Sequence, residues 1–258
     1  MKKALLAVAL IAVAVAATAS AQDWAKQRLE ASPRHREWVK LKSGERMVSA
    51  YVVYPEVKTK APAVVVVHEI FGMTDWVQLL ADELAAQGVI AIAPDLLSGI
   101  NLPAGDANAV GKAIRDLPPD QITADLNAAA DYVAKLPAAN GKVAVAGFCW
   151  GGTQAFRFAT NRPSLAAAYV FYGTGPDAVT SIKAPVYGFY AGNDARVGAT
   201  VPKTQELMKA AGKTYDVVTY DGAGHGFMRA GDAPTADAAN KKARDDAWAR
   251  WKALLAKL

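Results

Sequence analysis

Segments with strand-like and helix-like spacing of apolar residues alternate along this chain. Strand-like runs cover residues 47–54, 63–67, 89–93, 167–172, 185–190 and 215–220, and another begins at residue 143. Helical spacing covers residues 76–87, 122–136 and 236–257, and a further helix is expected to begin at residue 150. This alternation predicts an α/β fold, in which helices cover both faces of a mostly parallel central sheet.

Length and composition fit a single domain of that class. The chain has 258 residues, of which 52% are hydrophobic, and this is enough for one substantial core. Its interior contains no internal repeat, no low-complexity tract and no linker rich in Pro, Gly or Ser. We therefore expect one α/β domain over residues 47–258, preceded by an N-terminal extension over residues 22–46 whose order the sequence leaves open.

The first residues have the composition of an export signal. Two lysines follow Met1, an unbroken apolar run extends from Ala4 to Ala17, and small residues precede the expected cleavage after Ala21. An uncleaved anchor helix is disfavoured, because this apolar run is short for a bilayer span. We expect residues 1–21 to be a cleaved bacterial signal peptide. The mature chain is then secreted or periplasmic, without stable membrane insertion.

The charge pattern does not indicate a nucleic-acid partner. The formal net charge of +5 falls to +3 without Lys2 and Lys3, and basic residues are spread among acidic ones. No basic stripe is interleaved with aromatic residues. The charged clusters at residues 33–42 and 241–250 are interpreted as solvated faces. We expect a monomer without a nucleic-acid partner.

The only cysteine, Cys149, lies in the most informative motif of the chain. The motif Gly147-Phe148-Cys149-Trp150-Gly151 follows an apolar run and precedes the expected helix, as in a nucleophile elbow with sulfur in place of oxygen. Side chains at 147 or 151 would collide with neighbouring backbone in such a turn. The alternative is a buried and inert thiol, because free cysteines are usually buried.

A candidate base follows the cysteine. Of the three histidines, His35 lies in a charged segment and His68 precedes Cys149. Only His225 lies downstream, in a glycine-rich loop after the strand-like run at 215–220. Nucleophile elbows of this kind place their histidine last in the chain, so His225 is the predicted base.

A candidate acid lies between the two. Asp194 follows the strand-like run at 185–190, at the carboxyl end where an acid that orients His225 is required. A solvated Gly-Asn-Asp turn is the alternative for this residue. The order of the three residues predicts a catalytic triad of Cys149, Asp194 and His225.

Four motifs together resemble the dienelactone hydrolase family, which has the α/β-hydrolase fold. They are His68-Glu69-Ile70-Phe71-Gly72, Gly147-Phe148-Cys149-Trp150-Gly151-Gly152, Gly192-Asn193-Asp194 and Gly224-His225-Gly226-Phe227. The resemblance covers residues 48–258, nearly all of the mature chain. It implies a carboxylic ester or lactone hydrolase of the carboxymethylenebutenolidase type, although members of the family differ widely in substrate.

The first of these motifs predicts half of an oxyanion hole. Such a hole needs two backbone N–H groups, one from the loop after this strand and one from the residue after the nucleophile. By position these donors belong to Ile70 and Trp150. In the family the glutamate of this motif interacts with the resting thiol, and Glu69 matches it. A carboxylate there opposes formation of the Cys149 thiolate, whereas the alternative for Glu69 is a structural salt bridge.

The substrate-binding residues follow the family pattern only in part. Relatives that act on dienelactone hold its carboxylate with two arginines, and Arg229 matches the one that lies four residues after the histidine. The second has no counterpart after Pro94-Asp95-Leu96, where the next arginine is Arg115. This argues against dienelactone itself as the substrate. We expect Arg229 to bind a substrate carboxylate, with Trp150 and Phe227 as apolar walls.

A sulfur nucleophile restricts the chemistry. A thiol has a pKa of ~8.5, so a thiolate leaves a tetrahedral intermediate more readily than an alkoxide or an amide anion does. Turnover then favours esters with good leaving groups, such as enol lactones, and disfavours peptides. No metal or organic cofactor is expected, because no cluster of His, Cys and carboxylate residues has ligand spacing. Two alternatives stay open: acyl transfer or thioester cleavage on the same triad, and a non-catalytic relative that binds small acids.

Overall fold

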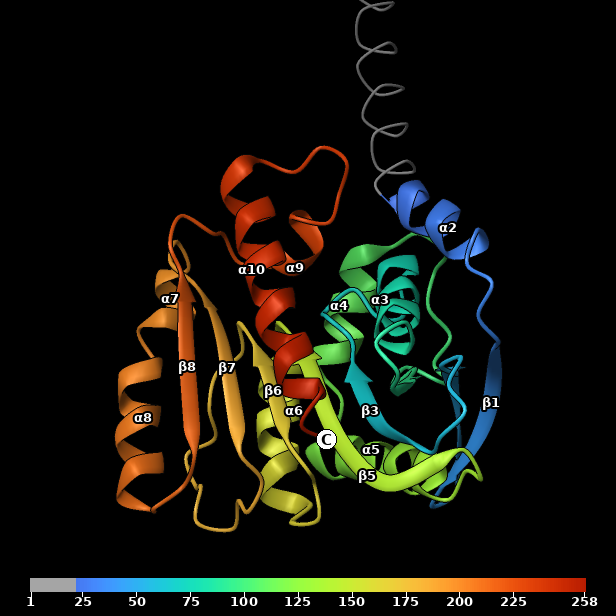
Figure 1. The fold of residues 1–258 in the computed structure, drawn as a ribbon, viewed down its shortest axis with the longest axis horizontal. Coiled ribbons are helices and arrows are strands. Elements are labelled where there is room, and N and C mark those ends of the chain that lie inside the picture. The colour runs from blue at the N-terminus through green and yellow to red at the C-terminus, as the bar shows by residue number, and fades with distance from the viewer. Residues whose placement is uncertain (1–21) are drawn as a thin grey trace, which may run out of the picture.

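An eight-stranded sheet runs through the protein in the order β1-β2-β4-β3-β5-β6-β7-β8 (Figure 1). The computed structural model describes residues 22–258, and the predicted signal peptide lies outside them. The strands are β1 Arg36–Ser43, β2 Arg46–Val53, β3 Ala61–Val67, β4 Ile90–Pro94, β5 Ala139–Phe148, β6 Ala168–Phe171, β7 Val186–Ala191 and β8 Tyr215–Tyr220. The helices are α2 Asp23–Glu30, α3 Asp75–Ala85, α4 Ala107–Arg115, α5 Pro119–Ala134, α6 Trp150–Asn161, α7 Ala195–Gly198, α8 Val201–Ala210, α9 Phe227–Ala230 and α10 Ala238–Leu255.

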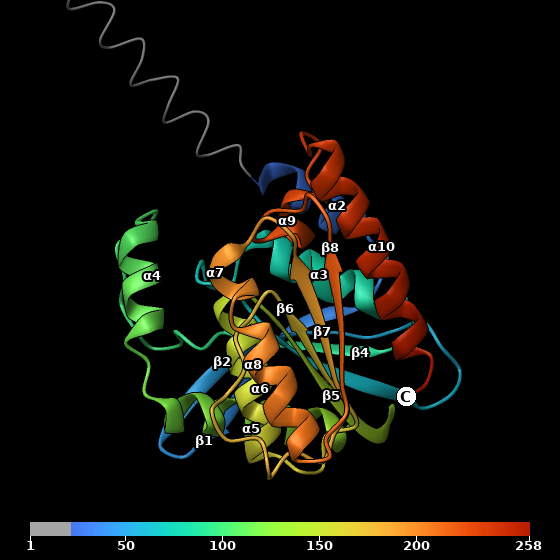
Figure 2. The same ribbon diagram turned by 90° about the vertical axis from the view of Figure 1, so that its left-hand side faces the viewer.

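Helices cover both faces of the sheet. From β4 to β8 all neighbouring strands pair in parallel, whereas β2 pairs antiparallel with both β4 and β1. Buried residues of α3 and α10, among them Trp76 and Trp251, form the core on one face. Buried residues of α5, α6 and α8 form the core on the other, and Figure 2 shows α10 and α8 on opposite sides of the sheet. The predicted α/β fold with a mostly parallel sheet is confirmed.

The strand order creates a reversal of direction beside β5. After β3 the chain passes through α3 to β4 on one side, whereas after β5 it passes through α6 to β6 on the other. The connections therefore leave β3 and β5 in opposite directions, which opens a crevice at the carboxyl ends of these two strands. Ligand sites of open α/β sheets lie at such a switch point.

The observed ends of the predicted elements lie within three residues of the expected ones, except that β5 begins four residues before residue 143, and the strand at 215–220 coincides with β8. Apolar periodicity missed α2, β1, α4 and α8, and the one-turn helices α7 and α9. β1 carries charged residues because it is an edge strand, which needs only the backbone pairing with β2. α4 begins where Asp106 accepts hydrogen bonds from the amides of Asn108 and Ala109, a cap that does not depend on apolar spacing.

The segment expected as an N-terminal extension packs against the rest of the domain. α2 buries Ala25 and Leu29 in the core that includes α3. Between α2 and β1, Arg34 donates to both carboxylate oxygens of the buried Asp82 on α3, at 3.1 and 2.6 Å. β1 then pairs with β2 along its whole length. Residues 22–46 therefore supply an ordered helix and an edge strand.

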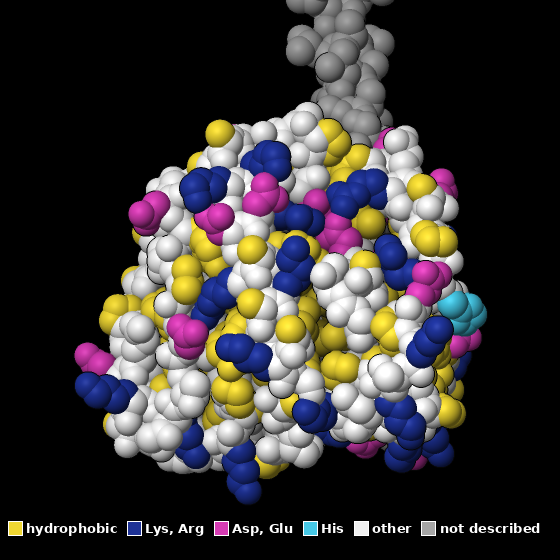
Figure 3. Space-filling model, viewed as in Figure 1, with side chains coloured by type: hydrophobic (Ala, Val, Ile, Leu, Met, Phe, Trp, Pro, Cys, Tyr) yellow, Lys and Arg dark blue, Asp and Glu magenta, His cyan; other side chains and the backbone are white. Residues whose placement is uncertain are grey.

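The molecular surface in Figure 3 mixes charges of both signs with apolar side chains, and no continuous basic patch covers this face. In the charged cluster at 241–250, Lys241 pairs with Asp245 and Lys242 pairs with Asp246, all four side chains being more than half exposed. The side chains of Arg244 and Arg250 in the same cluster are only 14% and 17% exposed, and Arg244 pairs with Glu83 and Asp232. The interpretation of residues 241–250 as a solvated face therefore holds for the two lysine–aspartate pairs and is wrong for these two arginines.

Close backbone contacts join α6 to the centre of the sheet. A Cβ added at Gly147 would lie 2.0 Å from the carbonyl oxygen of Gly151. One added at Gly151 would lie 2.3 Å from the carbonyl oxygen of His68 and 2.4 Å from that of Val67. The predicted collisions at 147 and 151 are therefore confirmed, and they allow the first turn of α6 to approach β3 and β5.

Replacing Gly151 by alanine tests this constraint. The new methyl group meets backbone atoms of β3, which cannot move without disturbing the sheet, so we expect Gly151→Ala to lower the free energy of unfolding by roughly 2–4 kcal/mol. Urea denaturation followed by circular dichroism measures the change. Gly198→Ala is the matched control, because a Cβ at Gly198 meets nothing within 4 Å. Equal stability of the two variants would contradict the close approach.

Candidate active site

Cys149 lies in a strained turn between β5 and α6. Its φ of 57° and ψ of −121° are rare for a residue with a side chain and cost roughly 1–3 kcal/mol. The amide of Cys149 donates to the carbonyl oxygen of Phe171 on β6 at 3.1 Å, which holds the turn at the carboxyl edge of the sheet. The residue is partly exposed. The alternative of a thiol buried in the core is therefore not observed.

His225 connects the thiol to a buried carboxylate. Its Nε2 lies 3.0 Å from Cys149 Sγ, and its Nδ1–H donates to Asp194 Oδ2 at 2.5 Å. Asp194 is only 8% exposed, and its Oδ1 accepts from the amide of Val197 at 3.2 Å. A neutral ring that donates through Nδ1 has Nε2 free to accept the thiol proton. The structure thus brings together the three residues that the sequence order predicts as a triad.

The surroundings of His225 favour its protonated form. The hydrogen bond with Cys149 is the main cause that raises the pKa of His225 to about 9; partial burial opposes it and the hydrogen bond with Asp194 supports it. The ring of Tyr172 packs edge-on against the imidazole, with 5.1 Å between centroids. Transfer of the thiol proton to His225 is thereby favoured, since the resulting imidazolium lies between two negative groups.

The two predicted oxyanion donors belong to residues that line the same cavity as the thiol. Ile70 is in the loop after β3, Trp150 is the first residue of α6, and both line one cavity with Cys149. Neither amide donates a hydrogen bond to another residue in the described part of the chain. The Trp150 amide also lies at the positive end of the α6 dipole. Both N–H groups are thus available to a ligand atom.

A buried histidine orients the loop that carries Ile70. His68 is fully buried, and its Nδ1–H donates to the carbonyl oxygen of Glu69 at 2.8 Å. Its ring stacks on that of Trp150, with 5.9 Å between centroids. Burial lowers the pKa of His68, so the ring is neutral. Sequence reasoning gave His68 no role, and the structure makes it the link between the two loops of the predicted oxyanion hole.

Glu69 and Arg229 are paired with each other. Arg229 Nε donates to Glu69 Oε2 at 2.7 Å, and the carboxyl group is buried while the guanidinium is about one third exposed. Burial raises the pKa of Glu69, and Arg229 opposes this effect. The guanidinium also lies 5.0 Å from the ring centroid of Phe71. This is the salt bridge that was the alternative for Glu69, and it engages the Nε–H of Arg229, the residue that was expected to bind substrate.

The structure corrects the expectation for Phe227. This side chain is fully buried and packs against Tyr172 and Tyr220, with ring centroids 5.3 and 5.2 Å apart. Tyr172 stands between Phe227 and the imidazole of His225. Phe227 therefore belongs to the core and does not form a wall of the cavity. Its apolar character in the sequence reflected burial.

A cavity of about 290 Å³ opens beside the thiol. Its lining residues are Ile70, Arg115, Cys149, Trp150, Thr153, Tyr172, Thr174, Arg196 and Val197. Trp150 is thus a wall, as predicted, whereas Arg229 and Phe227 are not part of the lining. Arg115 and Arg196 were not predicted to line the site. They lie on α4 and α7, which carry no recognisable motif, and only folding brings them to Cys149.

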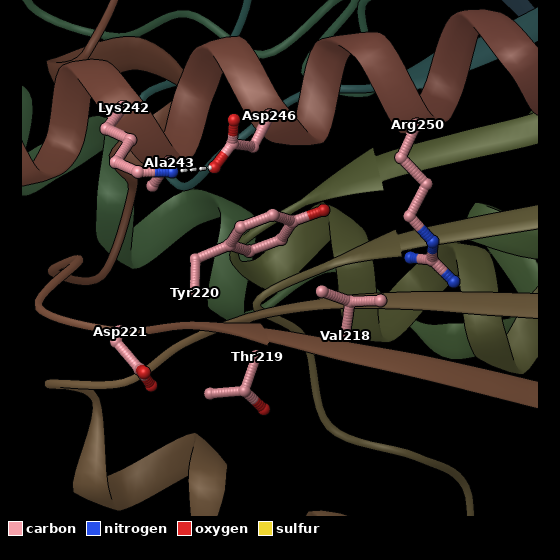
Figure 4. Close-up of a pocket in the computed structure, with 8 residues that line it drawn as sticks. All are labelled: Val218, Thr219, Tyr220, Asp221, Lys242, Ala243, Asp246 and Arg250. Carbon is pink, nitrogen blue, oxygen red and sulfur yellow. Dashed lines mark hydrogen bonds and ion pairs between the residues drawn. The ribbon is translucent and has the colours of Figure 1, made fainter.

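A larger groove of about 470 Å³ lies between β8 and α10 (Figure 4). It contains the pair Lys242–Asp246 and the side chain of Arg250, which donates to the carbonyl oxygens of Gly188 and Asp216. Neither a cysteine nor a histidine lines this groove. Its arginine already has acceptors, so the smaller cavity at Cys149 is the candidate active site.

Within residues 22–258 no three side chains of His, Cys, Asp or Glu are arranged to hold a metal ion. No helix of the described residues has both the length and the apolar composition needed to span a membrane.

Comparison with known proteins agrees with the four motifs. Several relatives bear the name "Putative carboxymethylenebutenolidase", and two of them illustrate the likeness. The one from Methylorubrum extorquens is 30% identical over 206 residues, which are 73% of this chain and 71% of the relative. The one from Escherichia coli is 32% identical over 209 residues, which are 73% of this chain and 74% of the relative.

A solved structure extends the likeness to the fold. The crystal structure of a "Putative Dienelactone Hydrolase" from Klebsiella pneumoniae matches with a TM-score of 0.78 and 27% identity. The match covers 88% of this chain and all of that one. The model of the dienelactone hydrolase family itself matches residues 48–258. The resemblance seen in the motifs is confirmed, and this chain belongs to the dienelactone hydrolase family.

Proposed function

We propose that this protein hydrolyses small carboxylic esters or lactones through an acyl-enzyme on Cys149. The observation that carries the proposal is the hydrogen-bonded series from Cys149 Sγ to His225 Nε2, at 3.0 Å, and from His225 Nδ1 to Asp194, at 2.5 Å. A nucleophile, a base and an orienting acid in this sequence of contacts are suited to acyl transfer. The names of the relatives support the same class of reaction.

The proposed reaction has two halves. His225 takes the thiol proton as Cys149 Sγ attacks the carbonyl carbon, and the amides of Ile70 and Trp150 stabilise the oxyanion. Collapse of the intermediate breaks the bond to the alkoxy or enol oxygen, which receives the proton from His225. Water then loses a proton to His225 and attacks the thioester, which releases the acid and restores the thiol. Asp194 keeps the imidazole oriented through both halves.

Glu69 is proposed to influence the thiol through its neighbours. Its carboxylate is paired with Arg229, and together with burial it raises the pKa of Tyr172 well above the ordinary value. Tyr172 is therefore a neutral side chain against His225. Negative charge on Glu69 favours the imidazolium form of His225 and opposes a thiolate on Cys149.

Loss of the sulfur tests the nucleophile. We expect Cys149→Ala to lower kcat/KM for 4-nitrophenyl acetate and for an enol lactone by roughly 10³-fold or more, because no other side chain can form the acyl-enzyme. Initial rates on the mature chain measure this. Lys203→Ala, an exposed change on α8, is the control for handling and purity. Activity retained in Cys149→Ala would refute the acyl-enzyme, and an inactive wild type would favour the non-catalytic alternative.

The pKa of His225 tests the hydrogen bond with the thiol. Because Cys149 is the largest cause that raises this pKa to about 9, we expect Cys149→Ala to lower it toward the ordinary value of ~6.5. Because the pKa of His225 is higher in the folded than in the unfolded protein, protonation of this ring stabilises the fold. This stabilisation is complete below pH ~6.5 and is lost as the pH rises through about 9. Titration of the imidazole signals by NMR measures both values. The same pKa for His225 in wild type and variant would be inconsistent with the contact.

Export is also part of the proposal. Residues 1–21 are proposed to be removed after Ala21, so that the mature protein begins at Gln22. Expression of the full chain in a bacterium, followed by fractionation and N-terminal sequencing, measures this. Uncleaved protein in the cytoplasmic fraction would contradict it.

A further inference from the structure

Two arginines at the cavity beside Cys149 have no hydrogen-bond or ion-pair partner among residues 22–258. The chain contains eleven arginines, all within the described residues. Nine of them donate hydrogen bonds to carboxylates, carbonyl oxygens or side-chain oxygens. Arg115 and Arg196 donate none to any residue between 22 and 258, and these are the two that line the cavity. Their guanidinium groups are available to a ligand.

Arg115 folds back along α4 toward the side chain of Ile70. Its Nη1 lies 3.4 Å from the position that a Cβ on Gly111 would take, and the next nearest atom to that position is Cγ1 of Ile70, at 3.6 Å. The guanidinium therefore folds back over Gly111 on the side of α4 that faces Ile70. A larger residue at 111 would push it away.

Arg196 reaches the cavity from the other triad loop. It lies two residues after Asp194 on α7, and the neighbouring Val197 is a buried part of the lining. The two arginines thus come from separate helices and are exposed at the rim. Neither aspartate nor glutamate is among the lining residues, so nothing in the cavity wall neutralises the two positive charges.

The rest of the cavity has a different character. Tyr172 and Val197 are buried and supply apolar surface, and Ile70 and Trp150 add to it. Arg229, the residue expected to bind a carboxylate, is held by Glu69 and does not line the cavity. Apolar walls near the sulfur and positive charge at the rim fit a substrate whose anionic end is remote from the scissile carbonyl.

We propose that Arg115 and Arg196 bind a carboxylate of the substrate and so determine the specificity of the protein. The inference rests on the proposed ester hydrolase function. Guanidinium groups hold carboxylates through paired N–H donors, and a cavity of about 290 Å³ admits a small acyl group that ends in one carboxylate. The substrate class is an activated ester or lactone with a free carboxylate at the end away from the reacting carbonyl.

A pair of matched esters tests the inference. Mono-4-nitrophenyl adipate carries a terminal carboxylate, and its terminal amide has the same shape without charge. We expect kcat/KM of the wild type to be about tenfold higher for the acid than for the amide, since exposed arginines contribute modestly to binding. In the double variant Arg115→Gln, Arg196→Gln the ratio should fall to about one. Lys112→Gln, which removes one charge from the same helix outside the cavity, should keep the wild-type ratio.

The outcomes separate the two proposals. One contrary result is that the wild type hydrolyses both esters through Cys149 without preferring the acid, and another is that the double variant keeps the preference. Either result overturns the role of the arginines but leaves the proposed hydrolase function standing. If neither ester is hydrolysed, the proposed function fails. Alkylation of Cys149 then tests whether Arg115 and Arg196 attract a carboxylate to the cavity. In the wild type, the ratio of the alkylation rate with iodoacetate to the rate with iodoacetamide should then exceed the same ratio for free cysteine. In the double variant this ratio should be lower than in the wild type. A ratio that is equal in both proteins overturns the inference.

Discussion

The close approach of α6 to the backbone of β3 and β5 is the constraint on which the candidate site depends. Gly147 and Gly151 allow it, because a side chain at 147 would overlap the carbonyl group of Gly151 in α6, and one at 151 would overlap the carbonyl groups at the end of β3. The approach keeps Cys149 in a strained conformation at the sheet edge and places the first residue of α6, Trp150, at the cavity beside the thiol. The strain at Cys149 persists because β5, β6 and α6 all restrain the turn.

The charged groups around Cys149 differ in their pairing according to how deeply they are buried. The buried carboxyl of Glu69 has a guanidinium partner, as an ionised group away from water requires. The arginines at the rim have none, because water solvates them without cost. Arg229 is thus paired with a buried carboxylate and lies outside the cavity lining, whereas Arg115 and Arg196 line the cavity, where we propose that they bind substrate.

The acid and base come from loops that the sheet brings together. Asp194 follows β7, His225 follows β8, and parallel pairing of these strands places both loops at the same edge as Cys149. Asp194 also caps α7, the helix that carries Arg196. Orientation of the imidazole and placement of one rim arginine thus depend on the same carboxylate, which links the predicted chemistry to the proposed specificity.

The sequence by itself determined the α/β class, most strands and the three residues of the predicted triad, because these depend on local periodicity, glycine sterics and chain order. It missed β1, an edge strand held by backbone pairing, and it assigned Phe227 to a cavity wall although Tyr172 separates it from the cavity. Only the tertiary structure decided which charges are paired and which are free. Glu69 and Arg229 are 160 residues apart in sequence, and no local pattern records a contact that arises when distant elements pack.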